Sequence, residues 1–113
     1  MATVAYLDID QGSDFTVQME LENDDGTPMN LIGFEVYSQF RKSYGSTIGY
    51  TFTTSIADVF NGVITLEYLG VDSSNIRPGR YLYDVELINS STARKTRVVE
   101  GIVTINAEIT KIP

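Results

Sequence analysis

Apolar and polar residues alternate along several short stretches of the chain, with the two-residue period of β-strands that have one buried face. The clearest stretch is 15–21, where Phe15, Val17, Met19 and Leu21 alternate with polar residues. Residues 34–41 repeat the pattern, and shorter versions lie at 50–56, 64–68, 81–88 and 97–105. Residues 3–9 alternate less regularly, which suits an edge strand. The pattern predicts seven or eight strands.

Turn signals separate these stretches, and only one short helical element is expected. Asp25-Gly26 and Asn61-Gly62 favour turns. The predicted fold is an all-β, immunoglobulin-like antiparallel β-sandwich of seven to eight strands, forming a single domain over 1–113. A small closed barrel has the same periodicity and remains the alternative. The three prolines, Pro28, Pro78 and Pro113, all fall outside strand interiors. In 70–79, the candidate capping residues Asp72, Ser73 and Ser74 allow one helical turn.

A turn at Pro78-Gly79 runs directly into a late strand that contains Tyr81 and Tyr83. In immunoglobulin-like sandwiches, a tyrosine at the start of the penultimate strand sends its hydroxyl back to nearby backbone and holds this corner. We expect Tyr81 to have that role and Tyr83 to stand where an antibody domain places its second cysteine. The alternative is a tyrosine pair that contacts a ligand.

The composition removes many kinds of chemistry. The 113 residues include no His and no Cys, so the usual zinc ligands, thiol nucleophiles and His-based general bases are missing. We therefore expect no cofactor, no metal site and no enzymatic activity, although a carboxylate pair for glycoside hydrolysis remains open. Asp8, Asp10 and Asp14 offer oxygen ligands for calcium without EF-hand spacing, which favours ordinary surface carboxylates.

The charge of the chain is negative and unevenly distributed. The formal net charge is −7, which argues against a nucleic-acid partner because phosphate binding needs clustered Lys and Arg. Residues 1–40 hold eight acids and no base. This asymmetry can steer a basic partner or a neighbouring copy, or it can serve solubility alone. No stretch of 18 apolar residues and no signal-peptide pattern occurs, so no membrane partner is expected.

Aromatic residues also gather in the segment 44–52. Tyr44, Tyr50 and Phe52 stand among Ser, Thr and Gly residues, a composition typical of adaptable recognition surfaces. We predict a contact surface here. The alternative is that Tyr50 and Phe52 face the core from an edge strand.

Eight segments follow one another in a definite order along the chain: 14–15, 25–28, 31–34, 39–43, 52–53, 62–66, 79–85 and 100–105. Together they resemble small immunoglobulin-like virion proteins of tailed bacteriophages. The same order of elements is found in the module at the start of baseplate upper proteins, and the resemblance covers roughly residues 13–110.

The resemblance implies a non-enzymatic structural part of a phage particle, assembled in the host cytoplasm and present in many copies per particle. Its partners would be other virion proteins, namely capsid, neck or tail subunits, with the chain acting as capsid decoration or as a neck, tail or baseplate adaptor. We expect docking through the end strands 3–9 and 103–109, by extension of a neighbour's sheet. The alternative function is a carbohydrate- or host-surface-binding module of the virion.

Overall fold

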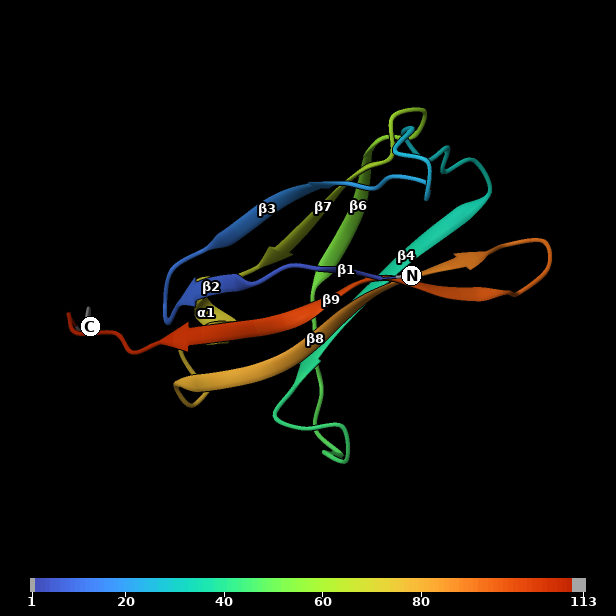
Figure 1. Cartoon of the computed structure of the whole chain (residues 1–113). Coiled ribbons are helices and arrows are strands. Elements are labelled where there is room, and N and C mark those ends of the chain that lie inside the picture. Colours follow the sequence, from blue (N-terminus) through green and yellow to red (C-terminus); the bar gives the residue numbers. More distant parts are fainter. Residues whose placement is uncertain (1, 111–113) are drawn as a thin grey trace.

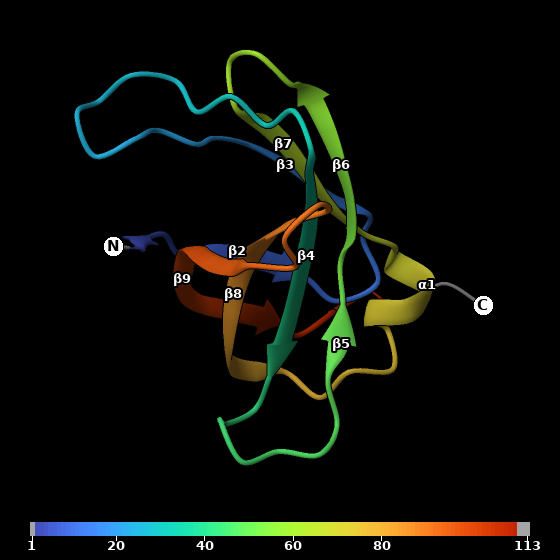
Figure 2. The ribbon, with the colours of Figure 1, turned by 90° about the vertical axis from the view of Figure 1, so that its right-hand side faces the viewer.

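Two β-sheets pack face to face and enclose the apolar side chains of the alternating strands (Figures 1 and 2). The computed structural model describes residues 2–110. The chain thus forms a sandwich of two separate sheets rather than a closed barrel. The small sheet contains β3 (Phe15–Glu20), β6 (Thr53–Asp58) and β7 (Val63–Tyr68). The large sheet contains β1 (Thr3–Val4), β2 (Leu7–Asp10), β4 (Phe34–Arg41), β5 (Tyr50–Thr51), β8 (Gly79–Asn89) and β9 (Lys95–Asn106).

The strand order is that of an immunoglobulin-like sandwich. The small sheet has the order β3-β7-β6, and the large sheet has the order β1-β9-β8-β4-β5 with β2 also beside β9. These orders correspond to the immunoglobulin strands B-E-D and G-F-C-C′. All ladders are antiparallel except those of β1 and β2 with β9, which are parallel. The predicted all-β sandwich is confirmed.

The stretch 50–56, expected as one strand, is divided between the two sheets. The chain leaves the large sheet after Thr51 and enters the small sheet at Thr53. Phe52 lies at this crossing, and its backbone N–H donates to the Ser38 carbonyl at 3.0 Å. Alternation reports which face of a strand is buried, and it contains no information about which sheet the strand joins.

The single helical turn is present as α1 (Gly70–Ser73), but its start is not capped by its own neighbours. The side chain at the N-cap position, Leu69, makes no capping bond. Instead, Oδ1 of Asp14 accepts a hydrogen bond from the Gly70 N–H at 2.8 Å. A carboxylate from the turn between β2 and β3 therefore satisfies one of the free donors of the first turn. Over residues 2–110, no helix is long and apolar enough to cross a membrane.

Aromatic rings fill the centre of the core. Phe40 is 0% exposed, and its ring centroid lies within 5.1–5.7 Å of four other aromatic rings. Such tilted and edge-on contacts add to the free energy gained by burial alone. The four rings belong to Tyr50, Phe52, Tyr68 and Tyr81.

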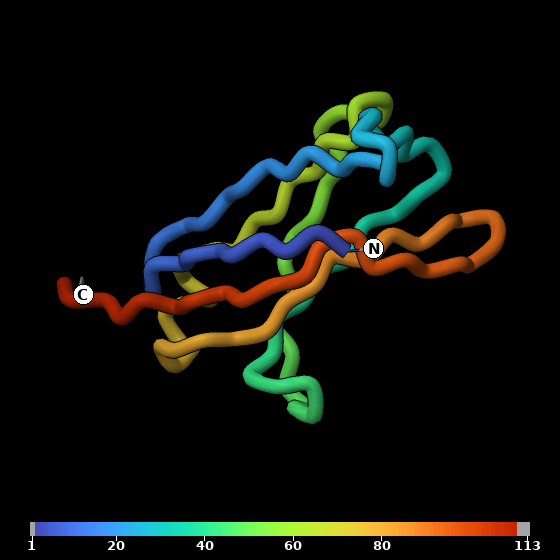
Figure 3. Tube along the Cα trace, in the orientation of Figure 1, coloured from blue at the N-terminus to red at the C-terminus, as the bar shows by residue number. Residues whose placement is uncertain are grey.

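The end strands differ from the expectation. Residues 3–9 do form an edge, in two short pieces, β1 and β2. The prediction of a docking edge at 103–109 is wrong, because β9 pairs with β8 on one side and with β2 on the other (Figure 3). Val103 to Asn106 have β2 partners, and the strand ends at Asn106. Pairing of β9 with β2, a parallel strand from the other end of the chain, does not change the alternation of apolar and polar residues within β9.

Candidate protein-interaction face

Tyr81 holds the corner at which the chain enters β8. Its hydroxyl donates to the carbonyl of Arg77, four residues upstream, which is the contact of the tyrosine corner. The side chain is 5% exposed, and its ring meets Phe40 edge-on with the centroids 5.7 Å apart. Burial raises the pKa of the hydroxyl above its ordinary value, so it stays protonated, and able to donate, to a higher pH than an exposed tyrosine does. Tyr81 therefore makes a structural contact.

Tyr83 joins the first segment of the chain to the core. Its hydroxyl donates to the Ala5 carbonyl at 2.7 Å, across 78 positions of sequence. Gly101 of β9 makes this approach possible, because a Cβ there would lie 1.9 Å from the Ala5 oxygen and 3.2 Å from Cε1 of Tyr83. The packed tyrosine thus occupies the predicted cysteine position and links β8 to the segment between β1 and β2 by a hydrogen bond.

The stability of the fold is expected to fall at alkaline pH because of Tyr83. Burial raises the pKa of its hydroxyl from 10.0 to about 12. The folded state favours the neutral phenol, so its contribution is fully present below about pH 10 and is lost as the pH rises through about 12. Urea unfolding measured across this range should show the decline. Tyr83→Phe should show a shallower one, and an equally steep decline in Tyr83→Phe would contradict the assignment.

The three aromatic residues predicted to form one contact surface lie in three different environments. Tyr44 is 80% exposed in the loop after β4. Tyr50 is half-buried, with its ring 5.1 Å from that of Phe40. Phe52 is 2% exposed and belongs to the core, so its prediction as a contact residue is wrong. Its ring fills the space between the sheets at the point where the chain crosses from one to the other.

The side of the large sheet turned away from the small sheet, called the outer face below, carries a hollow of about 450 Å³. Its apolar lining comes from residues far apart in sequence. Tyr6 is 72% and Val4 59% exposed, whereas Leu82 and Ile102 are half-buried. Val4 and Tyr6 lie within the end strand 3–9, which was expected from the sequence to dock by its edge, whereas Leu82 and Ile102 were missed. The sequence did contain a sign of them. In their strands the inward-facing positions are already apolar, so Leu82 and Ile102 are additional apolar residues at outward-facing positions. The apolar lining consists of Val4, Tyr6, Tyr44, Leu82 and Ile102.

Paired charges surround this apolar lining. Nε of Arg97 lies 3.1 Å from Oδ2 of Asp84, and its Nη1 lies 4.0 Å from Oε2 of Glu100. Nη2 of Arg41 donates to Oε1 of Gln39 at 2.9 Å. Such partly exposed pairs add only about 0–1 kcal/mol to stability. Their effect here is to hold polar groups around an apolar centre, the arrangement found in protein interfaces.

A second hollow, of about 500 Å³, lies under the loop between β4 and β5. Tyr50 and Tyr81 contribute aromatic surface to its lining, and Lys42 and Arg77 contribute positive charge. Nζ of Lys42 lies 4.9 Å from the Tyr81 ring centroid, within the range of a cation–π contact. Aromatic rings beside two cations favour a sugar-like or acidic ligand.

The acidic residues considered as calcium ligands are dispersed. Asp8 and Asp10 are exposed on β2, and Asp14 is bonded to the start of α1. Within the described part of the chain, no group of three acidic side chains is placed to hold a metal ion. Elsewhere, side-chain hydrogen bonds from Thr27 and Asn61 lower the pKa values of Asp25 and Asp58, respectively, so these carboxylates serve as turn acceptors.

Comparisons with known proteins found similarity in structure only. No protein-family model and no curated protein sequence matches the chain. The natural killer cell receptor NKp44 superposes with a TM-score of 0.47 and 13% identity, covering 94% of this chain and 99% of the receptor chain. A family 123 glycoside hydrolase from Clostridium perfringens superposes with a TM-score of 0.43 and 9% identity, covering 95% of this chain and 23% of the hydrolase chain. The fold assignment rests on the strand order and the tyrosine corner.

Proposed function

We propose that this chain is a non-enzymatic assembly module of a tailed-bacteriophage particle. It acts through protein–protein contacts as a capsid decoration or as a neck, tail or baseplate adaptor, in many copies per particle. The phage context comes from the sequence resemblance over roughly residues 13–110. Such a part needs a rigid fold that requires no metal or disulfide, and the chain has no cysteine.

The observation that supports an assembly role is the apolar outer face. The protein already buries a full core between its sheets, yet Val4, Tyr6 and Tyr44 remain more than half exposed around one hollow. Contiguous exposed apolar surface rimmed by polar groups marks interaction sites. Aromatic residues at such sites often provide most of the binding free energy.

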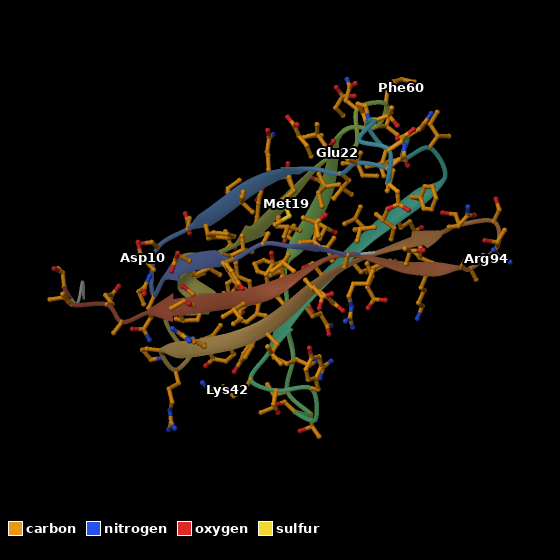
Figure 4. All side chains as sticks on the ribbon, in the orientation of Figure 1. Asp10, Met19, Glu22, Lys42, Phe60 and Arg94 are labelled. Carbon is orange, nitrogen blue, oxygen red and sulfur yellow. The ribbon has the colours of Figure 1, made fainter. Side chains whose placement is uncertain are left out.

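Particle composition and occupancy test this function. Mass spectrometry of gradient-purified particles should detect the polypeptide, and cryo-electron microscopy should place it in the symmetry of the head, neck, tail or baseplate. Tyr6→Asp should lower its occupancy at least about tenfold, equal to about 1.4 kcal/mol. Phe60→Asp is the control, because Phe60 is 65% exposed in the turn between β6 and β7, away from the outer face (Figure 4). Particles without the chain would contradict the proposal.

Carbohydrate or host-surface binding is the second candidate, supported by the hollow under the loop between β4 and β5. The half-buried Tyr50 offers stacking surface to a glycan, and Lys42 and Arg77 offer charge. Glycan-array binding that is lost in Tyr50→Ala would favour this function. Absence of binding, together with unchanged adsorption of particles carrying Tyr50→Ala, would end it.

A further inference from the structure

Among residues 2–110, strand β3 has a hydrogen-bonded neighbour on one side only. The small sheet has the order β3-β7-β6, so β3 forms its edge. In the immunoglobulin arrangement, strand A lies beside strand B, the equivalent of β3. Here the first two strands join the large sheet beside β9 instead, as the parallel ladders show (Figure 1). The place beside β3 is therefore unfilled among the described residues.

The backbone direction along β3 identifies which groups face this free edge. The Leu21 N–H, just after β3, donates to the Gly62 carbonyl at 2.8 Å. The antiparallel register then turns the backbone groups of odd-numbered residues toward β7, because neighbouring residues point their N–H and C=O groups to opposite sides. The N–H and C=O groups of Thr16, Gln18 and Glu20 consequently point away from β7.

The other edge strands of the sandwich are short or irregular. Where β4 extends beyond β5, its Val36 and Ser38 carbonyls already accept hydrogen bonds from the Thr54 hydroxyl and the Phe52 N–H. β1 and β5 have two residues each, and β2 has four. β6 has six residues, but its register is disturbed between Ile56 and Asp58. Short strands and bulges are the usual protection against unwanted strand pairing. β3 has neither form of protection: its six residues pair with β7 in an unbroken register.

A groove lies beside this edge, and its lining indicates which side chains an added strand would have to carry. It measures about 380 Å³ and opens between β3 and the start of β9. Its apolar lining includes Ala5, Met19 and Val98, all half-buried against the core. Glu20, Glu22 and Asp24 bring three carboxylates to the same groove, and Arg97 brings one cation, which is paired with Asp84 at 3.1 Å. An occupant would meet an apolar floor and a rim on which acidic groups outnumber basic ones.

We infer that β3 accepts an extended strand from another polypeptide, one in which basic residues alternate with apolar residues. Backbone hydrogen bonds to Thr16, Gln18 and Glu20 add the strand to the small sheet, its apolar side chains cover the groove, and its cations meet the acidic rim. A second copy of β3 fits poorly. Residues 14–25, which contain β3, hold five acids and no Lys or Arg, so a second copy would bring only negative charge to the acidic rim.

This inference deepens the proposed assembly function and rests on it for the source of the strand, another virion subunit. The probe is an acetylated and amidated peptide of about eight residues, in which Lys alternates with Val or Thr. Titration into the isotope-labelled full chain should shift the amide resonances of β3. Amide exchange at Thr16, Gln18 and Glu20 should slow at least about tenfold at saturation. The same peptide with Glu in place of Lys should not bind.

Two variants separate backbone pairing from side-chain contact. Gln18→Pro removes an outward N–H without removing a β3–β7 hydrogen bond, so it should abolish binding, whereas Gln18→Ala should bind normally. If Gln18→Pro fails to fold, the double variant Glu20→Lys, Glu22→Lys replaces it and should prefer the Glu peptide.

Four results would overturn the inference. Three come from the peptide titration: equal binding by Gln18→Pro, resonance shifts confined to the outer face, and no change at β3 at millimolar peptide. The fourth is slowed exchange in β3 that depends on protein concentration alone, which would identify a second copy as the occupant. The composition of purified particles distinguishes failure of the two proposals. If particles lack the chain, the phage assignment is wrong. If particles contain the chain but it does not bind the peptide, only the proposed docking at β3 is wrong.

Discussion

Phe40→Ala should lower the free energy of unfolding by about 3–5 kcal/mol, the usual cost of truncating a fully buried aromatic side chain. The ring is 0% exposed and contacts rings from both sheets, namely Tyr68 of the small sheet and Tyr81 of the large sheet. Its loss opens a cavity that the four neighbouring rings cannot fill without leaving their own contacts. Small domains have a total stability of only about 5–15 kcal/mol, so urea unfolding should show a variant close to the limit of folding.

The matched control for this substitution is Phe60→Ala. Phe60 is 65% exposed, and surface substitutions usually change stability by less than about 0.5 kcal/mol. The two variants remove the same atoms, so their difference measures burial and packing alone. Equal losses in the two variants would mean that Phe40 does not form the centre of the core.

Gly101→Ala should cost about 2–4 kcal/mol, which combines overpacking with a disrupted buried hydrogen bond. The added Cβ would meet the Ala5 oxygen at 1.9 Å and the Ala5 carbonyl carbon at 2.9 Å. These atoms belong to backbone, so relief requires the segment between β1 and β2 to move away from β9. That movement breaks the hydrogen bond from the Tyr83 hydroxyl to the Ala5 carbonyl.

Gly45→Ala is the control for this glycine, because a Cβ at Gly45 would have no heavy atom within 4 Å. It should leave the urea midpoint almost unchanged. Amide exchange gives a second measurement: Gly101→Ala should release the Ala5 amide, which donates to the Glu100 carbonyl at 2.9 Å. Retained protection of the Ala5 amide in Gly101→Ala, with wild-type stability, would contradict the predicted clash.

The outer face and the β3 edge differ in how far the local pattern could reveal them. Leu82 and Ile102 are visible in the sequence as apolar residues at outward positions, so the outer face was within reach of the alternation. The free edge of β3 was not. The edge is free because no strand pairs with β3 on that side, and this follows from the pairing of residues 3–10 with β9 instead.

Interactions that depend on local order were determined by the sequence itself. Strand alternation, the position of the helical turn and the contact of Tyr81 with Arg77 all involve residues a few positions apart, where chain geometry leaves few choices. The all-β class followed from the same local periodicity, because a two-residue period can bury one face only in a sheet.

Only the tertiary structure decided the contacts between distant segments. It placed Tyr83 against Ala5, 78 residues away, moved Phe52 into the core between two strands of different sheets, and covered β9 while leaving β3 free. Each of these outcomes depends on which strands become neighbours. Alternation is identical for a strand with one neighbour or two, so the position of a strand within its sheet, and with it the location of a docking edge, is set by long-range packing.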